Sequence, residues 1–171
     1  MLILGNAVAL VASLVMVYAG ILKKKKDIVL CYCIELALYS ISNILLGGIP
    51  GAIINVFGVL GNFLEYKNKL NNVVKIILTI LTTVLIILFN NLGVVGYLPL
   101  ICMIIYFWIL DIKDVFTFKC FIILVMVLWA VYDFSIKSYV ATTFDILTII
   151  STIISVIQLK KGKKKQKNKR K

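Results

Sequence analysis

Long apolar runs, separated by short polar or glycine- and proline-containing breaks, follow one another along the whole chain. A helix needs about 20 apolar residues to cross a bilayer, and most of these runs come close to that length. None shows the strict alternation of apolar and polar residues that is typical of a membrane β-barrel. The pattern predicts an all-α integral membrane protein with seven transmembrane helices, at about residues 3–22, 28–46, 53–66, 73–89, 94–110, 118–134 and 139–159.

The polar positions inside these runs recur after ninety residues. Asn43 and Asn55 flank a Gly-Gly-Ile-Pro-Gly turn in the first half, and Asp133 and Asp145 take the same places in the second half. Other pairs also keep a small, polar or aromatic type in register: Tyr39/Trp129, Gly58/Thr148, Gly61/Ser151 and Asn62/Thr152. The register indicates two three-helix repeats, with the fourth predicted helix as a linker between them.

The predicted repeats comprise residues 1–67 and 93–159, and residues 68–92 form the linker helix. Because the linker crosses the membrane once, the two repeats would be parallel, as in the three-one-three arrangement of sugar transporters of the SWEET type. The lysine-rich residues 160–171 remain, and we expect them to form a disordered cytoplasmic tail.

The distribution of basic residues predicts how the chain crosses the membrane. Of the 19 lysine and arginine residues, all but Lys137 fall in segments that seven spans would place on one side. Basic residues accumulate on the cytoplasmic side of membrane proteins. We therefore expect a multi-pass protein of the cell membrane with its N-terminus outside and its C-terminus in the cytoplasm.

The composition limits the partners and the chemistry. The chain is 62% hydrophobic, well above the roughly 45–50% of a soluble domain, so the lipid bilayer is its first partner. The basic tail fits anionic lipid, and no aromatic residue lies between its lysines as nucleic-acid binding would favour. The sequence leaves open whether the protein forms a homo-oligomer.

No histidine occurs, which excludes Ser-His and Cys-His catalysis and histidine metal sites. We expect no enzyme activity, no metal and no cofactor. The four cysteines fit buried thiols that pack as small hydrophobic residues.

Two intramembrane carboxyl groups are the candidates for an ion or proton site. An acidic residue near the middle of a spanning helix costs about 2.5–3.5 kcal/mol on insertion scales, so it is expected to face the bundle interior. Asp145 lies at such a depth in the seventh helix, and Asn55 takes the matching place in the third. Glu35 lies in the second helix, where it could instead pair with the lysines at residues 23–26.

A small solute could bind where the two repeats meet. If the third helix of each repeat lines the centre, Asn55 and Asp145 face each other, and Asn62 and Thr148 extend the two polar stripes. Trp129 could stack on a ring-shaped solute or belong to the aromatic belt of the membrane interface. Alternatively, Asn55 and Asp145 only join neighbouring helices by hydrogen bonds, at about 0.6 kcal/mol each.

Several motifs resemble the YgjV family of bacterial inner-membrane proteins. They are Gly96-Tyr-Leu-Pro-Leu, Trp108, Phe118-Lys-Cys, Leu128-Trp-Ala-Val-Tyr, Ser138 and Asp145, with Leu45-Leu-Gly, Pro50 and Lys67 in the first half. The resemblance covers about residues 28–160 and implies a distant likeness to SWEET and PQ-loop transporters, without a settled function. This chain departs from the family at two positions. The family often carries a glutamate where this chain has Asp145, and it carries a basic residue near Gly61 or Asn62 that this chain lacks.

Two functions remain from the sequence. The first is a small-solute transporter or facilitator whose midplane site is exposed to either side by rocking of the repeats. The second is a non-transporting scaffold or partner subunit. Transport requires Asn55 and Asp145 to line a cavity that water can enter, whereas a scaffold would bury them in helix contacts.

Overall fold

The chain folds into seven α-helices and one short 3-10 helix within the described residues. The computed structural model describes residues 1–21, 25–109 and 114–168. The elements are α1 (Leu2–Ile21), α2 (Lys25–Leu46), α3 (Ile49–Tyr66), α4 (Asn72–Phe89), η1 (Gly93–Tyr97), α5 (Leu98–Ile109), α6 (Val115–Ser135) and α7 (Tyr139–Asn168).

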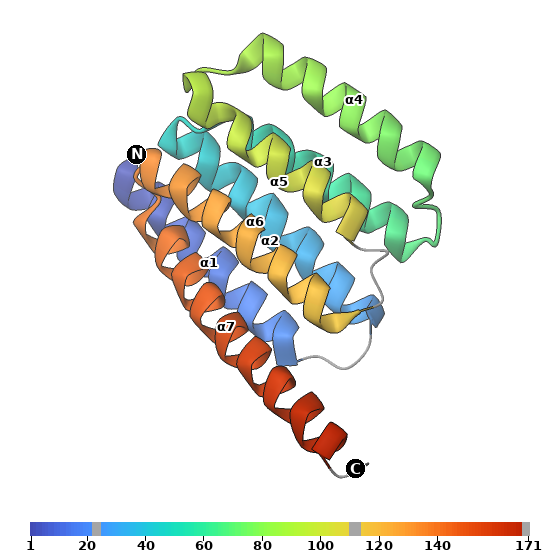
Figure 1. The fold of residues 1–171 in the computed structure, drawn as a ribbon. Coiled ribbons are helices and arrows are strands. Elements are labelled where there is room, and N and C mark those ends of the chain that lie inside the picture. The colour runs from blue at the N-terminus through green and yellow to red at the C-terminus, as the bar shows by residue number, and fades with distance from the viewer. Residues whose placement is uncertain (22–24, 110–113, 169–171) are drawn as a thin grey trace.

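Six of the helices form two layers of three (Figure 1). In the first layer α2 packs between α1 and α3, and in the second α6 packs between α5 and α7. The layers meet along their edges, where α1 packs on α7 and α3 packs on α5. Helix α4 lies outside both layers, against α3 and α5. The middle positions of the layers belong to α2 and α6, whereas α3 and α7, the third helices of the two predicted repeats, lie at layer edges.

Within the described part of the chain, five helices, α1, α2, α3, α4 and α7, are long and apolar enough to cross a bilayer. The predicted fifth span is shorter because its start is wound as the 3-10 helix η1, and Pro99 then lies at the beginning of α5. Proline lacks an N–H group, so it is tolerated in the first turn of a helix but not in its interior. The third helix begins earlier than predicted, with Pro50 in its first turn.

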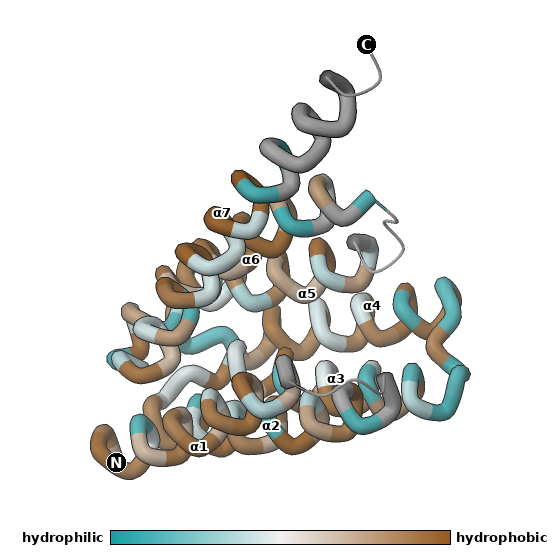
Figure 2. The backbone as a smooth tube through the Cα atoms, turned by 90° about the horizontal axis from the view of Figure 1, so that it is seen from below, coloured by the Kyte–Doolittle hydropathy of each residue, from teal (hydrophilic) through white to brown (hydrophobic). Residues whose placement is uncertain are grey.

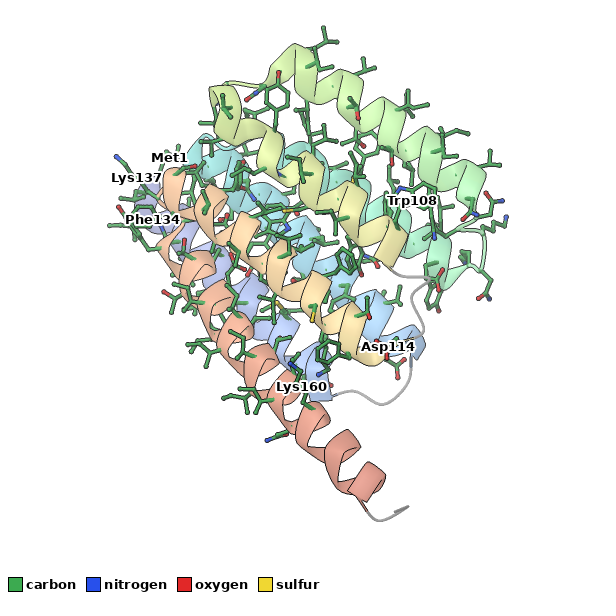
Figure 3. All side chains as sticks on the ribbon, in the orientation of Figure 1. Met1, Trp108, Asp114, Phe134, Lys137 and Lys160 are labelled. Atoms are coloured by element: carbon green, nitrogen blue, oxygen red, sulfur yellow. The ribbon has the colours of Figure 1, made fainter. Side chains whose placement is uncertain are left out.

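The bundle has two ends, and the helices between them are covered mainly by hydrophobic residues. Met1, Phe134 and Lys137 lie at one end, which we call the corner end, and Trp108, Asp114 and Lys160 lie at the other, the tail end (Figure 3). Hydrophobic residues cover the helices between them, and hydrophilic residues gather in the turn after α3 (Figure 2).

Helix α7 extends beyond the other helices at the tail end and continues to Asn168 (Figure 1). The expectation of a disordered tail from residue 160 was therefore wrong for residues 160–168. Lysine and glutamine are good helix formers, and one glycine in this segment costs only about 1 kcal/mol, so the spanning helix can continue into it.

Small residues let α1 approach α2 closely. Ala9 and Ser13 are fully buried, and Gly5 lies so near Leu46 that an added Cβ would come within 2.6 Å of its side chain. The Ser13 hydroxyl lies 2.7 Å from the Tyr39 hydroxyl. The position of this stripe at a helix contact confirms what the four-residue spacing of small side chains predicts.

The corners between α2 and α3 and between α6 and α7 have the same backbone, ninety residues apart. Gly47 and Lys137 have positive φ angles, 79° and 61°. In the first corner Gly48 N donates to Asn43 O at 2.7 Å, and in the second Ser138 N donates to Asp133 O at 2.8 Å. Both are the helix-ending hydrogen bonds of a Schellman motif.

Candidate functional site

Two carboxyl groups meet where α6 ends and α7 begins. Asp133 lies near the end of α6 and is 7% exposed, and Asp145 lies on α7 after the corner. Their carboxyl groups lie close enough to interact directly. Two carboxylates in contact would repel each other, so such a pair favours a shared proton or a bound cation.

One oxygen of this pair has no partner. The Oδ2 atom of Asp145 is buried, and no described group donates a hydrogen bond to it. A buried acceptor without a donor costs about 1–3 kcal/mol, so its presence calls for a reason other than stability. A cation, a proton or a hydrogen-bond donor of a solute would satisfy it.

The pair faces the first layer. Both carboxyl groups lie within electrostatic range of the Tyr39 hydroxyl on α2 and of the Cys102 thiol on α5. The Tyr39 hydroxyl is held by Ser13 of α1, and the Cys102 thiol donates to Val125 O at 3.6 Å. Groups on α2 and α5 thus interact electrostatically with Asp133 and Asp145.

The two layers are tied together beside this pair. The Tyr132 hydroxyl, fully buried, donates to Gly48 O at 3.0 Å and accepts from Gly51 N at 2.8 Å. A Cβ on Gly51 would lie 2.5 Å from that hydroxyl, so only glycine leaves room for it. The Tyr132 side chain, which belongs to α6, therefore enters the corner between α2 and α3 in the other layer.

The second corner is capped in the same manner from the first layer. Asn6 of α1 donates from Nδ2 to Lys137 O at 3.0 Å and accepts at Oδ1 from Val140 N at 3.1 Å. In both corners one side chain satisfies a carbonyl and an N–H group three residues apart. These reciprocal contacts close the molecule at the corner end.

Asn55 and Asp145, which we expected to face each other across the centre, lie on helices that do not pack closely on each other. Asn55 is buried on α3, at 3% exposure, but α3 packs on α2, α4 and α5, whereas α7 packs on α6 and α1. The partner of Asp145 is Asp133, which the repeat register marks as the counterpart of Asn43 but which we did not expect in a site. The same register could have found it, because two acidic residues flank one tight turn.

Among the described residues, no hydrogen bond joins the other predicted site residues to this pair. Asn62 donates to Gly58 O at 3.1 Å and Thr148 donates to Phe144 O at 2.9 Å, each within its own helix. Trp129 packs edge-on against Tyr132, with ring centroids 5.7 Å apart, and against the apolar core between α3, α4 and α5. That position is inside the bundle rather than in an interfacial belt.

Glu35 is buried in the middle of α2, at 8% exposure. The lysines at residues 23–26, named above as alternative partners of Glu35, lie outside the described side chains. No hydrogen bond or ion pair joins its carboxylate to any residue that the structure describes. Within the same described ranges, no group of three or more histidine, cysteine or acidic residues gathers at one place.

A comparison with protein families gives one match. The model of a family described as bacterial inner membrane protein, Imp-YgjV, matches residues 3–163, which is most of the chain. No curated protein and no solved structure matches it.

Proposed function

Because the chain belongs to the Imp-YgjV family of bacterial inner membrane proteins, we propose that it transports a small solute across that membrane. The observation that carries the proposal is the pair formed by the buried Asp133 and the partly buried Asp145, whose Oδ2 atom is buried without a partner. Ionisable residues inside a membrane are expensive, and they mark ion, proton or substrate paths. A scaffold would gain nothing from a carboxyl pair that two asparagines could replace.

The two layers would be the moving parts. In a three-one-three transporter, rocking of one triplet against the other exposes a midplane site to each side in turn. The contacts of Tyr132 and Asn6 close the corner end in this structure, so the proposed cycle requires them to open.

The membrane orientation follows the charges. Lys137 lies at the corner end, whereas Lys67, Lys69, Lys119 and Lys160 lie at the tail end. We propose that the corner end faces outward, in agreement with the positive-inside rule. In a variant without native cysteines, a cysteine at the exposed Ser135 should react with an impermeant reagent in intact cells. A cysteine at Lys69 should react only after permeabilisation, and the reverse result would overturn the orientation.

The transport proposal can be tested with purified protein in vesicles. A panel of labelled neutral, anionic and cationic solutes is screened for uptake above that of empty vesicles. Uptake of the solute found should be lost in Asp145→Asn and in Asp133→Asn, because an amide cannot exchange a proton or neutralise a cation. Asp27→Asn, which removes an exposed carboxylate at the start of α2, is the matched control and should keep full uptake.

Thermal unfolding separates loss of function from loss of fold. Both variants should stay folded, since asparagine already occupies the matching positions 43 and 55 in the first layer. Uptake unchanged by both substitutions would show that the pair only joins α6 to α7. Vesicles that take up no member of the panel would favour the scaffold.

A further inference from the structure

Four polar side chains form one stripe along the middle helix of the first layer. Tyr32, Glu35, Tyr39 and Asn43 are spaced three, four and four residues apart, which places them on one face of α2. From residue 32 to residue 43 this face covers about 16 Å along the helix axis, roughly half the hydrocarbon thickness. The stripe runs from the depth of the carboxyl pair toward the tail end.

The second layer has no such stripe. Ninety residues later, α6 carries Ile122, Val125, Trp129 and Asp133 at the same positions. Glu35 thus faces the interior from the one central helix that is polar along its length. The matching position in α6 holds the buried Val125. The fold therefore does not require an acidic residue at the position of Glu35.

The groups around Glu35 offer it no positive charge. Those within electrostatic range in the described part of the chain are Tyr32 and Tyr39 on α2, Tyr106 on α5 and Asp145 on α7. Helix α1 contributes the neutral hydroxyl of Ser13, which bonds to Tyr39, and α3 contributes no charged group to this set.

The nearest lysine position of the same helix, residue 26, precedes Glu35 by nine residues, about 13 Å along the axis. A buried carboxylate without a counter-charge is neutralised most readily by taking up a proton.

We propose that Glu35 is a proton-binding site, and that a proton passes between it and the Asp133–Asp145 pair along the Tyr39 face of α2. The transfer moves one proton from a carboxylic acid to a carboxylate, so the number of protons is conserved and no other reactant is needed. Tyr39 lies one turn from Glu35 on the same face of α2, and its hydroxyl interacts electrostatically with Glu35 and with both aspartates. The inference rests on the proposed function and names its coupling ion as the proton.

Carbodiimide labelling tests the site directly. Dicyclohexylcarbodiimide enters apolar regions and forms a stable adduct with protonated carboxyl groups, which mass spectrometry locates. In the purified full-length protein Glu35 should be labelled, and labelling should fall as the pH is raised. Asp27, exposed on the same helix, is the internal control and should stay unlabelled.

Two outcomes of the labelling would overturn the site. Glu35 could stay unlabelled at every pH in folded protein, or it could be labelled equally at every pH. The first would show that it holds no proton, and the second that the proton does not exchange. Protection of Glu35 by sodium ions at constant pH would show that it binds a metal cation instead.

Proton flux tests its role. In vesicles with a trapped pH-sensitive dye, an imposed inward-negative potential should drive proton entry through the unaltered protein. Glu35→Gln should lose this flux, Glu35→Asp should retain part of it, and Asp27→Asn should retain all of it. Flux that is unchanged in a folded Glu35→Gln protein would overturn the inference.

The two proposals fail differently. Lost Glu35 labelling with normal solute uptake removes the proton site but leaves transport. Normal labelling and proton flux with no solute uptake removes solute transport but leaves the proton site. Where Glu35→Gln does not fold, Glu35→Asp and the labelling of the unaltered protein still decide the question.

Discussion

The two corners of the molecule have one backbone but different side chains. In the first layer Asn43 precedes the α2–α3 corner and Asn55 follows it, and in the second Asp133 and Asp145 hold those places around the α6–α7 corner. The backbone hydrogen bonds and positive φ angles of the corners match residue for residue. What differs is charge, since the second half holds two carboxyl groups where the first holds two amides.

This difference separates structure from function. An amide satisfies the same turn and the same helix contact without a proton, so the fold alone does not require carboxyl groups. The first layer has its own acidic residue, but at Glu35, on the stripe of α2 rather than beside its corner. Each layer thus contributes acidic groups at a different depth of the shared interior.

The largest expected effect comes from giving the first half a carboxyl group. Asn43 donates from Nδ2 to Tyr39 O at 2.9 Å, while its Oδ1 has no partner. In Asn43→Asp the ionised carboxylate would face that carbonyl oxygen, at a cost of about 3–5 kcal/mol for an uncompensated buried charge. At acidic pH the protonated group can donate to Tyr39 O, so unfolding temperature should recover as the pH is lowered.

The control for this variant is Asp133→Asn, the reverse exchange. Its amide can still donate to Asp145, so the stability should change by less than about 1 kcal/mol at any pH. Thermal unfolding of both variants in detergent over a pH series measures the difference. Equal stability of the two would mean that the halves do not differ in their tolerance of charge.

Features that depend on neighbouring residues could be predicted from the sequence, whereas contacts between distant parts of the chain could not. The helix positions follow from runs of apolar residues, and the corners follow from the turn residues, which are local signals. The register of Asn43 with Asp133 is also local, and the structure places both at the same point of the same turn.

The contacts across the molecule could not be predicted. Which face of α7 meets α6 depends on how the two helices cross, and this decides that Asp145 lies beside Asp133. The entry of Tyr132 between Gly48 and Gly51 depends on the approach of α6 to the other layer, over about eighty residues of chain. Those glycines could be assigned to a turn from the sequence, but not to a pocket for a tyrosine.

A medium effect on stability is expected where the two corners differ in the room that they leave for a side chain. Gly51→Ala places a Cβ 2.5 Å from the Tyr132 hydroxyl and 2.8 Å from Asn43 Oδ1, both buried. Overpacking of this kind costs about 1–3 kcal/mol, and we expect the upper part of that range. The matched reverse change is Ala141→Gly, which should cost about 1 kcal/mol through backbone freedom alone.

A double variant identifies the cause. In a Tyr132→Phe background the nearest clashing atom, the hydroxyl oxygen, is gone, although the ring carbon 2.7 Å from the added Cβ remains. Gly51→Ala should therefore cost less than it does in the unaltered protein. Unfolding midpoints of the four proteins of this cycle give the coupling. Costs that simply add would show that the Tyr132 hydroxyl is not what the glycine accommodates.

A smaller effect is expected from the side chains that cap the corners. Tyr132→Phe removes two hydrogen bonds from a dry position, and we expect a loss of about 1–2 kcal/mol. Asn6→Ala removes the corresponding pair at a partly exposed position, so its loss should stay below about 1 kcal/mol. Chemical unfolding compares them, and a larger loss in Asn6→Ala would reverse the proposed order of the two caps.

The smallest effect concerns the backbone of the corners. Lys137 adopts φ 61°, a left-handed conformation that costs an L-residue about 1–2 kcal/mol, while Gly47 adopts φ 79° at no such cost. Lys137→Gly should therefore raise stability by about 0.5–1 kcal/mol, part of the gain being offset by the greater freedom of glycine in the unfolded chain. Gly47→Lys should lower it by a similar amount. Because a Cβ on Gly47 would meet nothing within 4 Å, this reverse change probes the backbone conformation alone. If neither exchange shifts the unfolding midpoint, the two corners share their shape without sharing its energetic cost.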